Sequence, residues 1–110
     1  MSEVVVIAKL VPREGRLQDL LDVLAALVPR VHAEESGNLL YAVHRTRGEE
    51  NGQVAMVERF ASIEAFKAHG ASATMAEHQP LLAAVLDGPA EVTVLDPVVF
   101  GESAKGSLAG

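Results

Sequence analysis

The sequence lacks cysteine and tryptophan, and it contains a single tyrosine, Tyr41. Without cysteine the chain can form no disulfide, offers no thiolate nucleophile and has no Cys-based metal or cluster site. Four histidines are present, but no two have the His-x-x-x-His or His-x-His spacing that places two ligands on one metal. We therefore predict no metal site.

Basic residues and long apolar runs are also scarce. Fifteen acidic residues against nine Lys and Arg give a net charge of −6 without a basic stripe, so we expect no nucleic-acid partner. The apolar runs, such as residues 81–86, are far shorter than a membrane span, and the amino end lacks the basic start and cleavage site of a signal peptide. These absences predict a cytoplasmic protein with no membrane partner.

The length and apolar content fit one globular domain. The chain has 110 residues, of which 49% are hydrophobic and 22% are charged, so it can form a core but has no room for a second one. We expect this domain to span residues 1–100. Residues 101–110 (GESAKGSLAG) are small and polar, and they predict a tail that is either mobile or an arm on a partner.

Four segments of the chain are predicted to be strands. Each is short, rich in β-branched or alternating apolar residues, and bounded by proline, glycine or polar residues. They span residues 3–11, 38–47, 53–60 and 91–100, and the last is expected to be interrupted at Asp96-Pro97. Glu49-Glu50-Asn51-Gly52 joins the second to the third, and its Asn-Gly pair predicts a hairpin turn with positive φ at both residues.

Two further regions have helical periodicity. Over residues 14–35, leucine and valine recur at three- and four-residue intervals and form an amphipathic stripe, with a kink or a loosened final turn expected at Pro29. The second region begins after Ser62, a suitable N-cap, and runs to about His69. Thr74-x-x-Glu77 then has the spacing of a capping box and predicts the start of another helical segment.

This order of elements is that of an α+β, ferredoxin-like β-α-β-β-α-β fold, an antiparallel sheet with helices on one face. The other sheet face is then uncovered, yet the first, third and last predicted strands are apolar on both faces. A soluble monomer would not expose such a face. We therefore expect a homodimer in which the two open sheet faces pack together.

Four stretches follow one another in an order and spacing found in a known family. They are VIAKLVPREGRLQDLLDVLAALVP, AEESGNLLYAVHR, MVERFASIEAFKAH and EVTVLDPV. Through them, over residues 3–97, the chain resembles the antibiotic biosynthesis monooxygenase family of the dimeric α+β barrel superfamily. The segment from Glu58 to His69 carries the most specific part of the resemblance. The resemblance implies a dimeric α+β barrel.

Members of this family include oxygenases that act on quinols or polycyclic phenols without metal, flavin or haem. The resemblance therefore implies a monooxygenase without cofactors, acting on a small aromatic quinol or phenol. In that scheme a base removes a phenolic proton, and the anion passes an electron to dioxygen in a closed pocket. His69 matches the family position of the base, and Glu58 is assigned as the carboxylate that orients it. The expected substrate-binding residues are Tyr41, Phe60, Phe66 and Met75.

Departures from the family pattern leave other interpretations open. Phe60 and Phe66 stand where relatives commonly carry Trp or Tyr, and Thr74 stands where many have a second histidine. The Asn-Trp-His set of the haem-degrading branch is absent, so no haem chemistry is expected. His69 could instead stabilise a helix end, and Glu58 could form an ion pair. The alternatives in function are a non-catalytic dimeric binding or accessory protein and a polyketide-type isomerase or cyclase.

Overall fold

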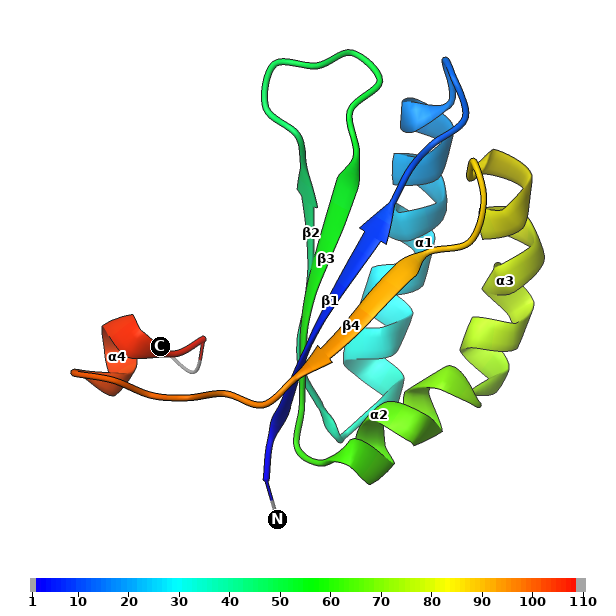
Figure 1. The fold of residues 1–110 in the computed structure, drawn as a ribbon. Coiled ribbons are helices and arrows are strands. Elements are labelled where there is room, and N and C mark those ends of the chain that lie inside the picture. The colour runs from blue at the N-terminus through cyan, green and yellow to red at the C-terminus, as the bar shows by residue number, and fades with distance from the viewer. Residues whose placement is uncertain (1, 109–110) are drawn as a thin grey trace.

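The computed structural model describes residues 2–108, and it contains a four-stranded antiparallel sheet with helices on one face (Figure 1). The strands are β1 (Val4–Leu10), β2 (Asn38–Arg45), β3 (Val54–Phe60) and β4 (Glu91–Leu95), in the order β2-β3-β1-β4. Helix α1 (Leu17–Glu34) follows β1, and helices α2 (Ile63–Gly70) and α3 (Ala73–Val85) follow β3. The predicted ferredoxin-like α+β fold is confirmed.

Strict alternation along the strands separates the two sides of the sheet. In β3, Val54, Met56, Glu58 and Phe60 are buried on the side of the helices. The residues between them point to the other side and stay partly exposed. Val57 is one of these, and its neighbour on β1 is Ile7. No helix from residues 2–108 covers this open face in Figure 1.

Helix α1 buries the predicted stripe against the sheet. Leu20, Leu27 and Val31 are fully buried, and the helix continues through Pro29 without interruption. The predicted N-cap of α2 is also confirmed, because the Ser62 hydroxyl accepts the Ala65 N–H at 3.1 Å. None of the helices within the described range is long and apolar enough to cross a membrane.

The predicted capping box at the start of α3 is wrong. The N-cap is Ser72, whose hydroxyl accepts the Met75 N–H at 3.1 Å. Thr74 lies inside the helix, is buried, and hydrogen-bonds to Glu34 on α1. Ser72 and Thr74 are both suitable caps, and the packing of α3 on α1 decides between them.

The predicted hairpin between β2 and β3 is present, but the tight turn predicted for it, with positive φ at both Asn51 and Gly52, is wrong. The positive φ in this loop lies at Gly48 (80°), not at Asn51 or Gly52. Pairing of the two strands continues only to Thr46, whose N–H donates to the Gln53 carbonyl at 2.9 Å, so the connection is a longer loop. A Cβ at Gly52 would lie 2.8 Å from the Thr46 Cβ. This glycine therefore permits close packing rather than a left-handed turn.

The last strand is shorter than the predicted 91–100, because Asp96-Pro97 ends the ladder after Leu95. The chain then leaves the sheet as an extended segment and forms one helical turn, α4 (Ser103–Gly106), away from the other helices (Figure 1). Phe100 in this segment is 81% exposed. The boundary between a domain at 1–100 and a tail at 101–110 stays a prediction, and residues 1, 109 and 110 lie outside the described part.

Candidate functional site

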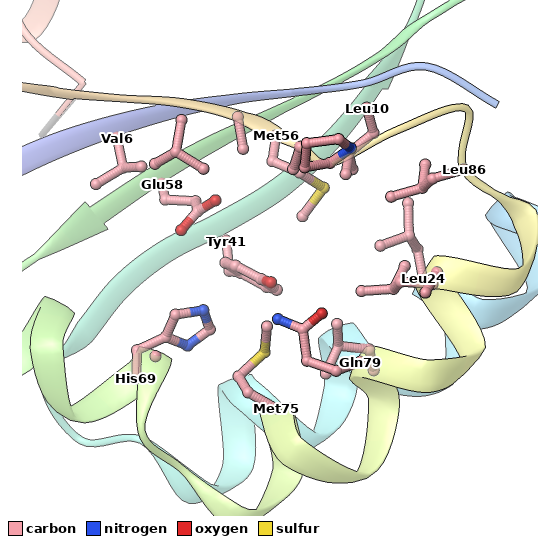
Figure 2. Close-up of a pocket in the computed structure, with 18 of the residues that line it drawn as sticks. Val6, Leu10, Leu24, Tyr41, Met56, Glu58, His69, Met75, Gln79 and Leu86 are labelled. Atoms are coloured by element: carbon pink, nitrogen blue, oxygen red, sulfur yellow. The ribbon is translucent and has the colours of Figure 1, made fainter.

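A cavity of about 660 Å³ lies between the sheet and helix α3. Helix α3 packs against α1 and stands off the strands, so side chains from the sheet, α1, α2 and α3 enclose the space between them. Figure 2 shows Glu58 and Met56 on the sheet side and His69, Met75 and Gln79 on the opposite side. Polar side chains gather at the His69 end of the cavity, and the other end carries Leu10, Leu24 and Leu86 (Figure 2).

Hydrogen bonds at both ends of α3 hold it in this position. At its carboxyl end, the Arg13 backbone N–H donates to the Val85 carbonyl at 2.9 Å. Near its amino end, Arg30 on α1 donates to Glu77 at 2.5 Å and to the Thr74 hydroxyl at 3.1 Å. Helix α3 is thus fixed to α1 and to the loop before α1, which leaves the space over the sheet free for a ligand.

Tyr41 and Glu58 are direct neighbours on β2 and β3, and both point to the helix side of the sheet. Tyr41 is 5% exposed and Glu58 is 4% exposed. Neither side chain has a hydrogen-bond partner within residues 2–108, and both reach toward the cavity in Figure 2. Their polar atoms are therefore available to a ligand.

Burial sets the protonation of these two groups. It raises the pKa of Glu58 from 4.5 to about 7, and the negative charge of Glu35 adds to the effect. Burial also raises the pKa of the Tyr41 hydroxyl, with smaller contributions from the charges of Glu58 and Glu35. Near neutral pH, Glu58 is therefore present as both acid and carboxylate, whereas Tyr41 keeps its proton and can donate it in a hydrogen bond.

His69 lies in the last turn of α2 and is 5% exposed. Its Nδ1 is 2.8 and 2.9 Å from the two carboxylate oxygens of Glu35. With Nδ1 turned to Glu35, the opposite nitrogen, Nε2, points into the cavity toward Glu58 and Tyr41 (Figure 2). The ring packs edge-on against Tyr41, with 5.2 Å between ring centroids. The sequence suggested that Glu58 pairs with His69. In the structure the carboxylate that pairs with His69 is Glu35.

Five of the six site residues predicted from the sequence line the cavity: Tyr41, Glu58, Phe66, His69 and Met75. Phe60 is the exception. It is fully buried beneath the site, where its ring contacts Phe66 at 5.4 Å and His69 at 5.2 Å between centroids. Phe60 packs beneath the residues of the site and does not face the cavity, because its position in β3 places it under α2.

Glu35, the C-cap residue of α1, was not among the site residues predicted from the sequence. Its approach to His69 depends on close packing between the turn after α1 and helix α2. A Cβ at Gly37 would lie 2.7 Å from the Ala65 Cβ, and the Gly37 carbonyl accepts the Ala61 N–H at 2.9 Å. Gly37 is the one signal in the sequence that could have indicated this contact.

The remaining histidines have other surroundings. Nδ1 of His78 lies 2.8 Å from the carbonyl of Thr74 in its own helix, and His44 is exposed on β2. Of the four histidines, all within the described range, only His69 lines the cavity. No group of three or more His, Asp or Glu side chains in this range is placed to hold a metal ion.

The chain is similar to one known protein family in sequence and to several solved structures in fold. The family described as "Antibiotic biosynthesis monooxygenase" matches residues 3–81, which include Glu35, Tyr41, Glu58 and His69. No curated protein matches the sequence.

Several solved structures have the same fold and 26 or 27% sequence identity. A protein from Caulobacter crescentus, provisionally named an antibiotic biosynthesis monooxygenase, is 26% identical with a TM-score of 0.81, over 88% of this chain and 91% of that one. Rv0793 from Mycobacterium tuberculosis is 27% identical with a TM-score of 0.80, over 92% of this chain and 100% of that one. SO0527 from Shewanella oneidensis is 26% identical with a TM-score of 0.73, over 86% and 93%.

Proposed function

The chain belongs to the antibiotic biosynthesis monooxygenase family, and from this premise we propose that it is a cofactor-independent monooxygenase of a small aromatic quinol or phenol. The observation that carries the proposal is the polar end of the cavity. There a histidine nitrogen, a carboxyl group of raised pKa and a phenolic hydroxyl face one space, and the rest of the lining is mainly apolar. Such a space suits an aromatic ring with a hydroxyl group at one end.

In the proposed reaction, Nε2 of His69 accepts the proton of the substrate hydroxyl. The O–H bond breaks, and its electron pair stays on the substrate as a phenolate. The electron-rich ring then reduces dioxygen, the co-substrate. Over the whole cycle the substrate loses two hydrogens and gains one oxygen atom, and the second oxygen atom leaves as water. The hydroxyl of Tyr41 and the protonated form of Glu58 can donate hydrogen bonds to the oxygen atoms that become negative.

We propose further that the protein acts as a homodimer, joined through the open face of the sheet. The apolar residues of this face are Val5, Ile7, Leu40, Ala42, Ala55, Val57 and Leu95. Burying about 1,000 Å² of apolar surface would contribute about 25 kcal/mol before the costs of association. This contribution favours a second copy of the chain as the cover of the open face.

The proposed activity is tested by oxygen uptake with a panel of quinols and phenols. The matched controls are the same compounds with their hydroxyl groups methylated, which offer no proton to His69. We expect uptake only with the free hydroxyl compounds, and one labelled oxygen atom in the product when labelled dioxygen is supplied. Binding without oxygen uptake would contradict the proposal and favour a binding protein. Conversion without dioxygen would favour an isomerase or cyclase.

A further inference from the structure

Glu35 makes the only polar contact of the His69 ring within residues 2–108. We propose that Glu35 is a positioning residue of the site, which holds the proton of His69 on Nδ1 and so presents an unprotonated Nε2 to the ligand. The inference rests on the proposed function, because it assigns the residue that prepares His69 as the base. It also separates the roles of the two carboxylates near the ring.

The chemistry of the two groups fixes the direction of the hydrogen bond. An ionised carboxylate can only accept, so the imidazole nitrogen that contacts Glu35 must carry the hydrogen. In a neutral imidazole the other nitrogen is then the acceptor. The contact is well formed, with both carboxylate oxygens within 2.9 Å of Nδ1, and the side chains of His69 and Glu35 are only 6% and 14% exposed.

The backbone holds Glu35 in place from both sides. Its N–H donates to the carbonyl of Val31 at 3.1 Å, and its carbonyl accepts the N–H of Asn38 at 3.1 Å. The residue therefore belongs to a defined turn between α1 and β2. Gly37 allows this turn to pack directly on α2, the helix that carries His69. Two separate elements thus bring the carboxylate and the ring together.

Glu58 cannot fill this role in the same geometry. It comes from β3, across the cavity, and has no hydrogen bond to His69 or to another of residues 2–108. Glu35 therefore acts through His69, whereas Glu58 faces the ligand directly. When Nε2 takes the phenolic proton, the ring becomes a cation beside the Glu35 carboxylate. The carboxylate stabilises that charge without taking the proton itself.

The test compares Glu35→Gln with Glu58→Gln, two variants that change a carboxylate to an amide at nearly equal size. Nitrogen NMR of the unliganded protein reports which nitrogen of His69 carries the hydrogen. We expect Nδ1 in the unaltered protein and in Glu58→Gln. In Glu35→Gln the side-chain amide can donate to Nδ1, so we expect the hydrogen to move to Nε2.

The kinetic measurement uses the phenol or quinol found active in the oxygen-uptake panel. Glu35→Gln should lower kcat by about 10²-fold with little change in KM, because a hydrogen on Nε2 blocks the base. Glu35→Asp keeps a carboxylate and should recover part of the loss. Circular dichroism checks that each variant is folded, and the tautomer of the unaltered protein needs no variant.

Two results would overturn the inference: a hydrogen on Nε2 in the unaltered protein, or full kcat in a folded Glu35→Gln variant. If no phenol causes oxygen uptake, the proposed function fails, while the NMR measurement still decides the role of Glu35. In that case phenol binding by calorimetry replaces kcat. Equal affinity for phenol in Glu35→Gln and the unaltered protein would then count against the positioning role.

Discussion

The two faces of the sheet are built from alternating residues of the same strands, yet they differ in whether their charged side chains have partners. On the helix side, Glu58 projects into a cavity and has no hydrogen-bond partner within residues 2–108. On the open side, its neighbour Arg59 donates to both carboxylate oxygens of Glu3, at 2.6 and 3.1 Å. Adjacent residues of one strand thus carry a charge left unpaired and a charge fully paired.

The paired and the unpaired charge indicate different roles for the two residues. A charge kept for stability is paired, as Arg59 is, because an unpaired buried charge lowers stability. Glu58 lowers stability when ionised, and it lies where a ligand can reach it. Groups of this kind are concentrated at functional sites. We therefore assign the proposed chemistry to the inner face and the proposed association to the open face, on which Ile7 and Val57 are paired neighbours.

The largest effect is expected from a charge at the centre of the open face. Val57→Lys should weaken the dimer by about 10³-fold, because it places an unpaired cation in the interface. Sedimentation should show the unaltered protein at twice its 11.6 kDa chain mass at micromolar concentration, and the variant as a monomer or an aggregate. Leu81→Lys, at an exposed position on α3, is the matched control and should stay dimeric. A folded, monomeric unaltered protein would contradict the role given to the open face.

Much of this contrast can be predicted from the sequence, because a strand has a period of two. Alternation alone places Val57 and Glu58 on opposite faces, and the apolar content of both faces indicates a sheet with one uncovered side. The partner of His69 could not be predicted in this way. Glu35 is 34 residues away in sequence, and the contact forms only when the turn at Gly37 packs on α2. Local pattern carries no signal for such a contact between elements.

The tight turn predicted at Asn51-Gly52 was wrong for a related reason. Asn51-Gly52 has the local preference for a tight turn, but the loop places its positive φ at Gly48 and packs Gly52 against Thr46. The same glycine can serve a left-handed turn or a close approach, and only the surrounding packing decides which.

Burial of Glu58 on the inner face should make the free energy of unfolding depend on pH. The folded protein holds the Glu58 proton up to about pH 7, whereas the unfolded chain releases it near 4.5, so stability falls as pH rises between these values. Glu58→Gln has no proton to release, so it should gain up to about 3 kcal/mol relative to the unaltered protein at high pH.

Urea unfolding at about pH 5 and about pH 9 measures this gain, which should be larger at the higher pH. Glu50→Gln, in the exposed hairpin loop, is the control and should change little at either pH. An equal gain at both pH values would show that the carboxyl group of Glu58 is not perturbed by its position on the inner face.

Removing His69, the proposed base, tests the chemical role proposed for the inner face. His69→Ala should lower oxygen uptake with an active phenol by about 10²-fold, the usual scale for loss of a general base. His44→Ala, on the exposed end of β2, should keep full activity. If His69→Ala retains turnover and only lowers the melting temperature, the imidazole is a helix-end stabiliser, and the proton acceptor must be Glu58 or the substrate itself.

The smallest effect is expected from the ion pair on the open side. The hydrogen bonds from Arg59 lower the pKa of Glu3, and the attraction of the guanidinium adds to them. Glu3 is therefore ionised more readily in the folded state, so the pair stabilises the protein above pH 4.5 and is lost as pH falls. Glu3→Gln should destabilise the protein by about 0.5 kcal/mol near neutral pH, because the Glu3 side chain is 30% exposed and solvent weakens the pair.

The sign of this effect distinguishes the two faces more clearly than its size. Glu3→Gln should lose stability mainly at high pH, whereas Glu58→Gln should gain stability there, although Arg59 and Glu58 are adjacent in β3. Added salt at about 1 M should reduce the loss in Glu3→Gln, since an exposed pair is screened. Urea unfolding with and without salt measures both effects. A gain in stability in Glu3→Gln near neutral pH would mean that desolvation of the Glu3 carboxylate destabilises the protein more than the pair with Arg59 stabilises it. The contrast between a paired outer charge and an unpaired inner one would then fail.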